Sequence, residues 1–468
     1  MDQDFHYYGT FYAARVAGYD AADATLIAKC SNFIDFLHEG EYGGYWRLVR
    51  DAARLPSADR YLVVGELTSP RYTFQAGKLS TGVSPEDGMW CSYHFTPGNY
   101  ADPPGTPTPK QVHGIPVANR LPRPPMGNAG RHHEVRETRG ISSVTLAKLL
   151  NRPMSALSRA LLADTIACAT STERLRKILR HALGSWELLP DNEQVANRNL
   201  ARFKLCLLGA RAHVIADTWA HQDWSGLSHE MNTYWDVRGA GWGRQSIEYQ
   251  DVGDDWKNVV LKSTNHENLQ AVPNGTSYLG HGWMGHFPDY SFVKYRYKPC
   301  WRLQTDPPFV RNNPEQYRHA FLELCSLFMR SRGGIFNPDT DQDALESAQE
   351  AISSPCDIAD KAVCPRAHSS TQWMQSMREY GLPTSVIDAK KEPDPAGVLA
   401  GILEKSTAWT RYGTYVVNAS SDLYLFQIAI DYHFHFVRHW LKTHDILNFS
   451  GSWSGQVGAV APTISDLF

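Results

Sequence analysis

The chain has 468 residues, enough for about three domains of ~150 residues or for one large enzyme body with insertions. Hydrophobic residues make up 42%, aromatic residues 12% and charged residues 20%, which indicates a packed globular protein and excludes disordered, collagen-like and coiled-coil chains. A formal net charge of -3 provides no overall field that favours nucleic acid or an anionic membrane. The unusual feature is the number of histidines, which is 19.

Targeting and redox signals are sparse. No apolar run approaches the ~18 residues of a membrane span, so no transmembrane helix is predicted. The start, Met1-Asp2-Gln3-Asp4, is acidic where a signal peptide is basic, which predicts a cytoplasmic protein or export by a signal-independent secretion system. The eight cysteines are scattered without a CxxC pair. We therefore expect reduced core thiols rather than metal ligands, with Cys356 and Cys364 as the one candidate disulfide pair.

The first half of the chain alternates helical sequence with long loops. Residues 97–125 hold nine of the 27 prolines and predict a loop or insertion. The spacing of apolar residues predicts helices at 5–16 and 20–37, with Gly18 between them, and a strand at 61–64. Helical sequence follows at 143–183, interrupted at Pro153, and a long helix is predicted from 192 to about 224.

The second half begins with a Gly-, Asn-, Trp- and Tyr-rich stretch, residues 225–312, which predicts loop with irregular pieces. Helices are predicted at 313–331, 341–353, 394–411 and 420–444. The expected fold is mainly α: a helical body over 1–311, with a Pro-rich insertion near 97–140, and a helical extension over 312–468 packed on it. Long loops in a compact protein are often functional.

One helical stripe carries the strongest chemical signal. His213, Asp217 and His221 are spaced i, i+4 and i+8, so a helix places them on one face. Their neighbours are Ala, Val and Ile, so the polar groups are expected to be buried and to need partners. A divalent metal would satisfy all three together, whereas the alternative is three packed polar residues. One helix supplies only two or three of the four ligands of a closed site, so others must come from elsewhere.

Candidates for these further ligands come from four segments. The chain start offers Asp4 and His6, and Asp35 follows apolar positions at the end of the second predicted helix. His94 lies in an aromatic, strand-like run, Trp90–Gly98. The last segment, Leu279–Asp289, offers His281, His286 and Asp289 between glycines.

The order of these motifs resembles the zinc-dependent phospholipase C and P1 nuclease superfamily, whose helical domain holds three zinc ions. Three stretches are similar to the bacterial zinc phospholipases C that lack a signal peptide: Asp-Phe-His-Tyr-Tyr-Gly-Thr, Ala-His-Val-Ile-Ala-Asp-Thr-Trp-Ala-His, and Gly-His-Gly with Phe-Pro-Asp. The resemblance covers roughly residues 1 to 300 and implies that the helical body is a phospholipase C/P1 nuclease-like metal-binding domain.

The resemblance implies three ligand sets. One ion would lie among Asp35, His94, His213 and Asp217, a second among His221, His281 and Asp289, and a third at His6 with Asp217 as the bridge. His221 follows Asp217 more closely than in well-known members. Those members also use the mature amino terminus as a ligand, for which Asp4 is the expected substitute here. His281 is preferred to His286 because glycines bracket it, and Asp289 is either a ligand or a turn residue.

The activity implied is hydrolysis of phosphatidylcholine-like lipid at a membrane surface to diacylglycerol and phosphocholine. Asp217 would bridge ions and Asp35 would act as general base. Tyr7, Tyr8 and Trp283 would contact the choline headgroup through cation-π attraction. The alternatives are a nuclease or phosphomonoesterase with the same metals, which the neutral charge disfavours for nucleic acid, and a non-catalytic effector or lipid-binding protein with structural zinc.

Two features stay open at this stage. His435 and His439 form a second HxxxH on a predicted helix, either as packed residues or as a further metal or phosphate contact. The sequence does not predict the oligomeric state.

Overall fold

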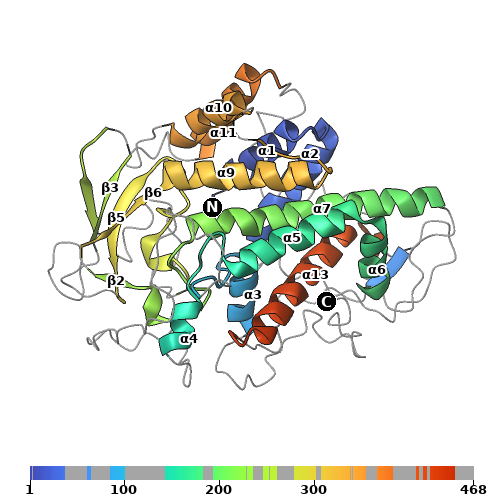
Figure 1. The fold of residues 1–468 in the computed structure, drawn as a ribbon, viewed down its shortest axis with the longest axis horizontal. Helices are drawn as coiled ribbons and strands as arrows, with labels where there is room; N and C mark the ends of the chain where they lie inside the picture. Colours follow the sequence, from blue (N-terminus) through green and yellow to red (C-terminus); the bar gives the residue numbers. More distant parts are fainter. Residues whose placement is uncertain are drawn as a thin grey trace.

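The structure is a computed structural model, and it describes residues 1–2, 4–36, 61–64, 85–100, 143–182, 193–227, 229–235, 246–251, 253–260, 279–301, 307–337, 339, 341–354, 366–382, 407–409, 415–418 and 422–447. They form a mainly helical protein with a small antiparallel sheet at one end (Figure 1). The mainly α class expected from the sequence is confirmed. The Pro-rich segment from residue 101, Cys356 and Cys364 lie outside the described residues.

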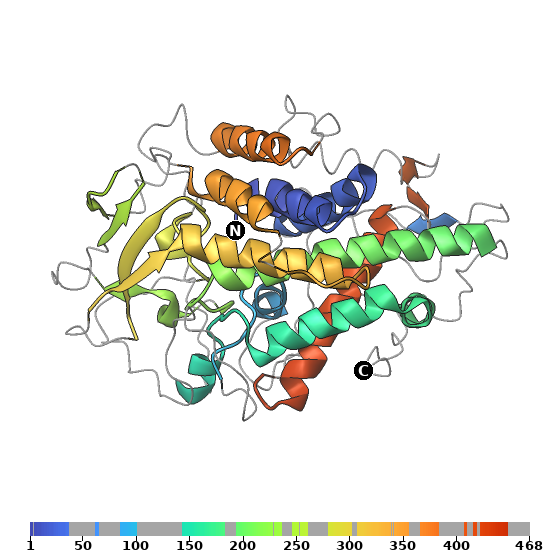
Figure 2. The ribbon, with the colours of Figure 1, turned by 45° about the horizontal axis from the view of Figure 1, so that its top comes forward.

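The long helix α7, Glu193–Ala220, runs through the centre of the molecule (Figures 1 and 2). It packs against α2 (Ala21–Phe33), α5 (Ala156–Thr170), α9 (Asn313–Arg330) and α13 (Asp422–Thr443). Its second half is apolar on almost every side apart from the histidine stripe, which is what a helix surrounded by others requires. The helix therefore carries its polar stripe into the interior.

Close contact between α7 and α2 depends on Gly209. A Cβ atom at this position would lie 2.4 Å from the carbonyl oxygen of Ile27 and 2.6 Å from Cβ of Cys30. Any larger side chain would push the two helices apart. The absence of a side chain brings the end of α2, and with it Asp35, next to the stripe on α7.

The N-terminal segment enters as a π-helical turn, η1 (Asp4–Gly9), and continues as α1 (Thr10–Val16). Gly18 has φ +83°, a left-handed conformation that ends α1, and Asp20 caps α2 by accepting the backbone N–H of Asp23 at 2.8 Å. The short 3-10 turn η2, Ile34–Phe36, follows α2 and carries Asp35. The two predicted N-terminal helices are thus confirmed.

The other helices cover the centre. α3 (Pro85–Tyr93), α4 (Ser143–Lys148) and α6 (Thr172–Ala182) come before α7, and α10 (Gln342–Ser353) and α11 (Arg366–Glu379) follow α9. One buried hydrophobic cluster draws residues from α1, α7, α9 and α13, so helices from both sides of residue 312 share a core. No helix in the described ranges is long and apolar enough to span a membrane.

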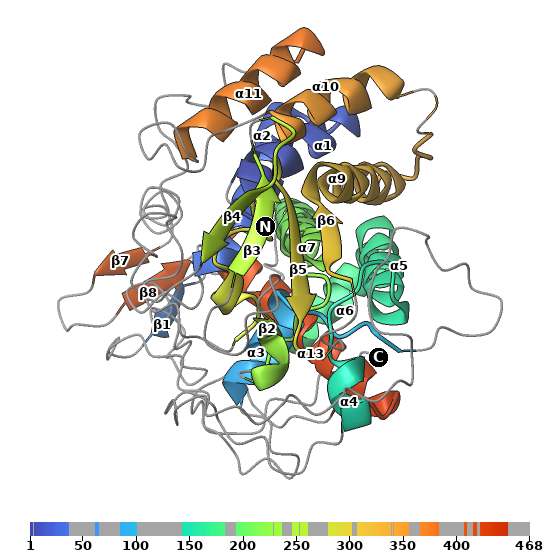
Figure 3. The same cartoon turned by 90° about the vertical axis from the view of Figure 1, so that its left-hand side faces the viewer.

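The larger sheet has five antiparallel strands: β2 (Tyr234–Trp235), β3 (Ser246–Gln250), β4 (Lys257–Val260), β5 (Lys294–Pro299) and β6 (Phe309–Asn312). β5 pairs with β2, β3 and β6, and β3 also pairs with β4 (Figure 3). An aromatic core that includes Trp224, Phe287 and Tyr295 lies beneath it. A second sheet has the order β1 (Tyr61–Val64), β8 (Tyr415–Asn418), β7 (Thr407–Trp409).

Three sequence predictions are corrected. Residues 225–312 contain strands, because partners that are distant in the sequence, such as Tyr249 and Tyr295, pair with each other. The helix predicted at 394–411 is wrong at 407–409, which is strand β7. The strand-like run at 90–98 begins inside α3, where the Ser92 hydroxyl donates to the carbonyl of Gly88 at 2.7 Å.

The six cysteines within the described ranges are buried and form no disulfide there, as expected for reduced core thiols: Cys30, Cys91, Cys168, Cys206, Cys300 and Cys325. None belongs to the candidate metal groups among the described residues.

Candidate metal centre

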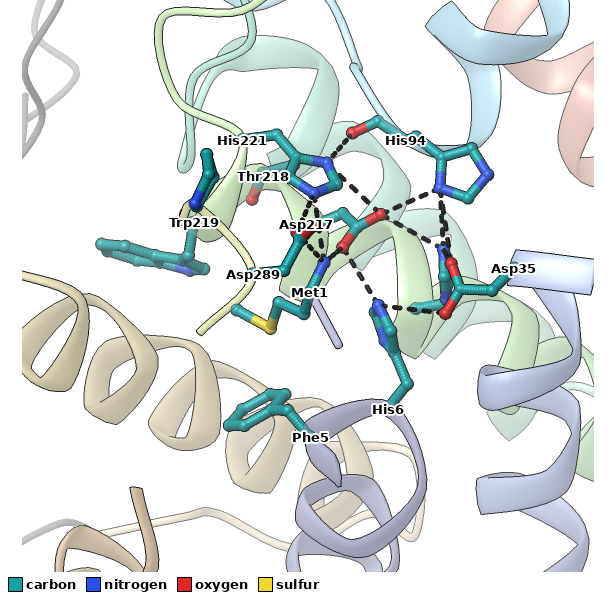
Figure 4. Close-up of polar contacts among 12 residues, drawn as sticks. Met1, Phe5, His6, Asp35, His94, Asp217, Thr218, Trp219, His221 and Asp289 are labelled. Carbon is teal, nitrogen blue, oxygen red and sulfur yellow. Dashed lines mark hydrogen bonds and ion pairs between the residues drawn. The ribbon is translucent and has the colours of Figure 1, made fainter. Parts of the chain in front are cut away.

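Three groups of side chains each bring their possible ligand atoms within 4.8 Å of one another. We name them the Asp35 group (Asp35, His94, His213), the His6 group (His6, His213, Asp217) and the Asp289 group (His221, His281, Asp289). Figure 4 shows most of these side chains converging from α7, η1, η2 and the residue after α3. Eight of the nine candidate metal ligands named from the sequence thus lie together, and Asp4 does not.

Asp217 lies at the centre and directs its two oxygens to different partners. Oδ1 lies 3.1 Å from Nε2 of His6, while Oδ2 lies 3.2 Å from both Nδ1 of His94 and Nε2 of His213. Its side chain is 1% exposed. This is the arrangement expected of a carboxylate shared between two sites.

The Asp35 group is more open. Oδ1 of Asp35 lies 3.8 Å from Nδ1 of His94 and 3.7 Å from Nε2 of His213. These separations are too long for hydrogen bonds, but ligand atoms ~2.1 Å from one tetrahedral ion lie about 3.4 Å apart. The Asp35 side chain is 26% exposed, against 1% for Asp217, so Asp35 is the more accessible of these two carboxylates.

The Asp289 group is built from the end of α7 and the turn that follows residue 279. Nε2 of His221 lies 2.9 Å from Oδ1 of Asp289, and Nε2 of His281 lies 3.4 Å from Oδ2. The opposite nitrogens are fixed: Nδ1–H of His221 donates to the carbonyl of His94, and Nδ1–H of His281 to that of Gly285, both at 2.8 Å. Each imidazole therefore presents its Nε2 lone pair to the group.

His286 belongs to no group, although its Nδ1 lies 3.7 Å from Oδ2 of Asp289. Its side chain is 30% exposed, against 13% for His281. The preference for His281 over His286 therefore agrees with the geometry.

Phe95 and Gly280 shape this group; the sequence pointed to Gly280 only as a glycine beside His281, and it gave Phe95 no role. The Phe95 ring stacks on His221 with centroids 4.7 Å apart and contacts His281 at 5.7 Å. Gly280 has φ +54°, and a Cβ there would lie 2.0 Å from the Phe95 ring. The only available signal was the glycine next to His281.

The expected role of Asp4 is corrected. Asp4 is half-buried, and desolvation followed by the charge of Asp2 raises the pKa of its carboxyl group to about 7. The nitrogen of Met1 lies instead at the cluster, 2.5 Å from Oδ1 of Asp217, 3.1 Å from Nε2 of His221 and 3.2 Å from Oδ1 of Asp289. Burial alone would lower the pKa of this amino group, but the carboxylates, Asp217 foremost, raise it to about 11.

Burial sets the charge state of the imidazoles. It lowers the pKa of His94 to about 4, and it lowers the pKa values of His6, His213 and His221 as well. These rings are therefore neutral at pH 7, which is the form that binds a metal.

The pKa values of the two carboxyl groups, Asp217 and Asp35, are shifted in opposite directions. Burial would raise the pKa of Asp217, but His221 and the Met1 amino group hold it well below its usual range. Burial and the charge of Asp217 raise the pKa of Asp35 well above its usual range. Carboxylates this close in a buried site need a cation, which the ammonium of Met1 supplies only in part.

The aromatic residues expected to bind substrate differ in exposure. Tyr7 and Tyr8 are buried in the main core and meet edge to face at 5.1 Å. Trp283 is half-buried next to His281. Of the three, only Trp283 is half-buried, whereas Tyr7 is 8% exposed and Tyr8 2%.

The second HxxxH forms no metal group in the described part of the chain. His435 and His439 are half-buried on α13. Their neighbour His433 is buried, with its ring Nε2 2.7 Å from the carbonyl of Ser92, so it ties α13 to the end of α3. This connection supports the segment that carries His94.

The chain belongs to DUF6765, a family of unknown function, whose model matches residues 1–441. No curated protein and no solved structure matches the chain significantly. The match reaches residue 441, within α13, so it includes helices after residue 312 as well as the candidate metal ligands.

Proposed function

We propose that this protein is a zinc-dependent phosphodiester hydrolase, a phospholipase C acting on choline phospholipids. The observation that carries the proposal is Asp217, whose two oxygens face separate sets of histidines while a third ligand group lies beside them. Ligand groups this close are typical of hydrolases that stabilise both the attacking and the leaving oxygen of a phosphate ester.

The donor set fits zinc. The three groups offer imidazole nitrogens and carboxylate oxygens without thiolates, a combination common in catalytic zinc sites. Each group contains three candidate ligands, with His213 shared between the Asp35 and His6 groups, and the Asp35 and Asp289 groups include partly exposed members. Open positions and access to solvent favour catalysis over a purely structural role.

Each carboxylate has a distinct task in this proposal. When bound, zinc ions supply Lewis-acid stabilisation of the phosphoryl oxygens and activate a water for in-line attack. Asp217, buried and shared, holds two groups at a fixed separation. Asp35 is the more accessible and accepts the proton of the attacking water at a carboxylate oxygen.

The choice of lipid rests on the resemblance of the motifs and on Trp283. This half-buried ring lies in the same turn as His281, where it can face a quaternary ammonium. Tyr7 and Tyr8 support the proposal less, because the core covers them.

The test combines metal content with substrate arms. Purified protein is analysed for zinc and then incubated with phosphatidylcholine vesicles, single-stranded DNA and a phosphomonoester. Phosphocholine release that a chelator and His213→Ala abolish, but the matched control His439→Ala does not, is the expected result. If the protein cleaves only DNA or only the monoester, the proposed substrate is that molecule and not the lipid. A zinc-loaded protein inactive on all three would refute the enzymatic proposal.

A further inference from the structure

The turn that carries His281 and Asp289 has little regular structure of its own. It contains one short 3-10 turn, η4 (Gly282–Met284), and a few local bonds, such as Asp289 N–H to the carbonyl of His286 at 2.8 Å. His221 directly follows α7, where its N–H still bonds to the carbonyl of Asp217 at 2.9 Å, whereas the two other ligands of this group depend on the turn. What holds the turn therefore determines the geometry of the Asp289 group.

Two side chains of α9 hold it. The amide Nδ2 of Asn313 donates to the carbonyls of Phe287 and Tyr290, each at 2.8 Å. The hydroxyl of Tyr317 donates to the carbonyl of Asp289 at 2.6 Å. The Tyr317 hydroxyl also lies 3.2 Å from the carbonyl oxygen of Pro288, so two side chains from one helix contact all four backbone carbonyls of residues 287–290.

Asn313 and Tyr317 are themselves held in fixed positions, so they can hold the turn in place. Asn313 and Tyr317 are spaced i and i+4 on the first two turns of α9, and both are 0% exposed. The Tyr317 ring packs edge to face on Phe5, with centroids 5.1 Å apart, which fixes the hydroxyl against the N-terminal segment. Buried hydrogen bonds of this kind keep their geometry because water does not compete for them.

The other two groups are supported differently. Asp217 and His213 lie within α7, and His6 lies within η1, so helical backbone fixes them. Asp35 lies in the 3-10 turn η2, and His94 directly follows α3, where its N–H bonds to the carbonyl of Trp90 at 3.0 Å. The Asp289 group alone draws two of its three ligands from a turn whose carbonyls are held by α9.

We propose that Asn313 and Tyr317 are positioning residues that set the affinity of the Asp289 group for its ion and leave the other two groups unaffected. The proposal rests on the proposed function only in requiring that the groups bind metal. It also gives the helices after residue 312 a role, since α9 completes a site formed by residues before it.

The test measures zinc binding, not turnover. Tyr317→Phe removes one hydroxyl and keeps the ring on Phe5, while Asn313→Asp removes both donors at similar size. Losing an outer partner of a metal ligand typically lowers metal affinity by about 10–100-fold. We expect that change for one ion per chain, by competition with a chromophoric chelator, and unchanged affinity for the other ions.

A matched control separates positioning from general destabilisation. Tyr432→Phe also removes a buried hydroxyl, which donates to Asp164 at 3.0 Å away from the turn, and it is expected to lower stability without changing any zinc affinity. His281→Ala should weaken the same ion, and adding Tyr317→Phe to it should change zinc binding no further.

Cobalt substitution provides a second readout. The visible spectrum of the most weakly bound Co2+ should change in Tyr317→Phe and stay unchanged in Tyr432→Phe. Equal weakening of all ions, or no change in any, would overturn the proposal, as would a wild-type chain that leaves the Asp289 group empty at saturating zinc. If wild type binds three ions and Tyr317→Phe weakens one, but no phosphodiester is cleaved, the proposed function fails and this inference stands.

Discussion

Oδ1 of Asp217 lies 3.1 Å from Nε2 of His6, although 211 residues separate them in the chain. Through its other oxygen the same carboxylate reaches His94, so one side chain of α7 connects the start of the chain with the end of α3. If the groups bind zinc, this carboxylate is the residue on which at least two ions depend.

Asp217→Asn tests that dependence. The amide keeps the size of the side chain but removes its charge, so we expect the His6 and Asp35 groups to lose zinc affinity by more than about 100-fold. Zinc per chain after dialysis measures the effect. Asp251→Asn is the matched control, since it removes a buried carboxylate that pairs with Lys257 in the sheet region. Equal zinc content in the two variants would contradict the bridging role.

The depressed pKa of His94 predicts a pH effect on the metal-free protein. Between its ordinary value of 6.5 and the folded value of about 4, the unfolded chain binds a proton that the folded chain does not. Stability from this group is therefore complete above pH 6.5 and is lost as pH falls toward 4, by roughly 3 kcal/mol.

Urea unfolding in chelator, for wild type and His94→Gln, measures this contribution, because the difference between the two proteins removes most other titrating groups. We expect the free energy of unfolding of wild type to fall relative to the variant between pH 6.5 and 4. A difference that is independent of pH would show that His94 is not buried as described.

Gly280→Ala tests the close approach of Phe95. The added Cβ would lie 2.0 Å from the ring, so both backbone strain and steric overlap result. Gly253→Ala has a similar φ, +86° against +54°, with nothing within 4 Å, so it should incur only the strain, about 1 kcal/mol. We expect Gly280→Ala to destabilise clearly more in urea unfolding and to weaken the ion of the Asp289 group. Similar losses in both variants would argue against the stack on His221.

Asp164→Asn separates stability from metal binding. Asp164 is the buried partner of Arg211, with Oδ2 3.1 Å from Nη2, and it also pairs with Arg174 at 2.5 Å. Removing its charge leaves the guanidinium of Arg211 buried without a carboxylate, which costs about 3–5 kcal/mol. Urea unfolding should show this loss while zinc content stays at the wild-type level. An unchanged unfolding free energy would contradict the importance of this pair.

Features encoded by local periodicity could be predicted from sequence. The stripe His213, Asp217, His221 and the helix that carries it follow from spacing alone. The order of the other motifs led to His6, Asp35, His94, His281 and Asp289, which the structure brings into the same region.

Features that depend on contacts between distant residues could not be predicted from the sequence. The strands between 246 and 312 pair with partners that are distant in the sequence. The aromatic run before His94 is helical because α13 and α7 pack against α3. Asp4 lies one helical turn from the chain start, and nothing local distinguishes it from the nitrogen of Met1 as the group that enters the cluster. The hydrogen bonds from Asn313 and Tyr317 could not be predicted either. Every residue has a backbone carbonyl, so the residues that accept these bonds have no characteristic sequence.

Anomalous scattering at the zinc edge, from crystals of the protein grown with zinc, counts the bound ions and identifies their ligands. We predict separate peaks at the Asp35, His6 and Asp289 groups, with Asp217 next to two of them. A crystal with no peak in these groups, or with one fully protein-coordinated ion elsewhere, would contradict this prediction.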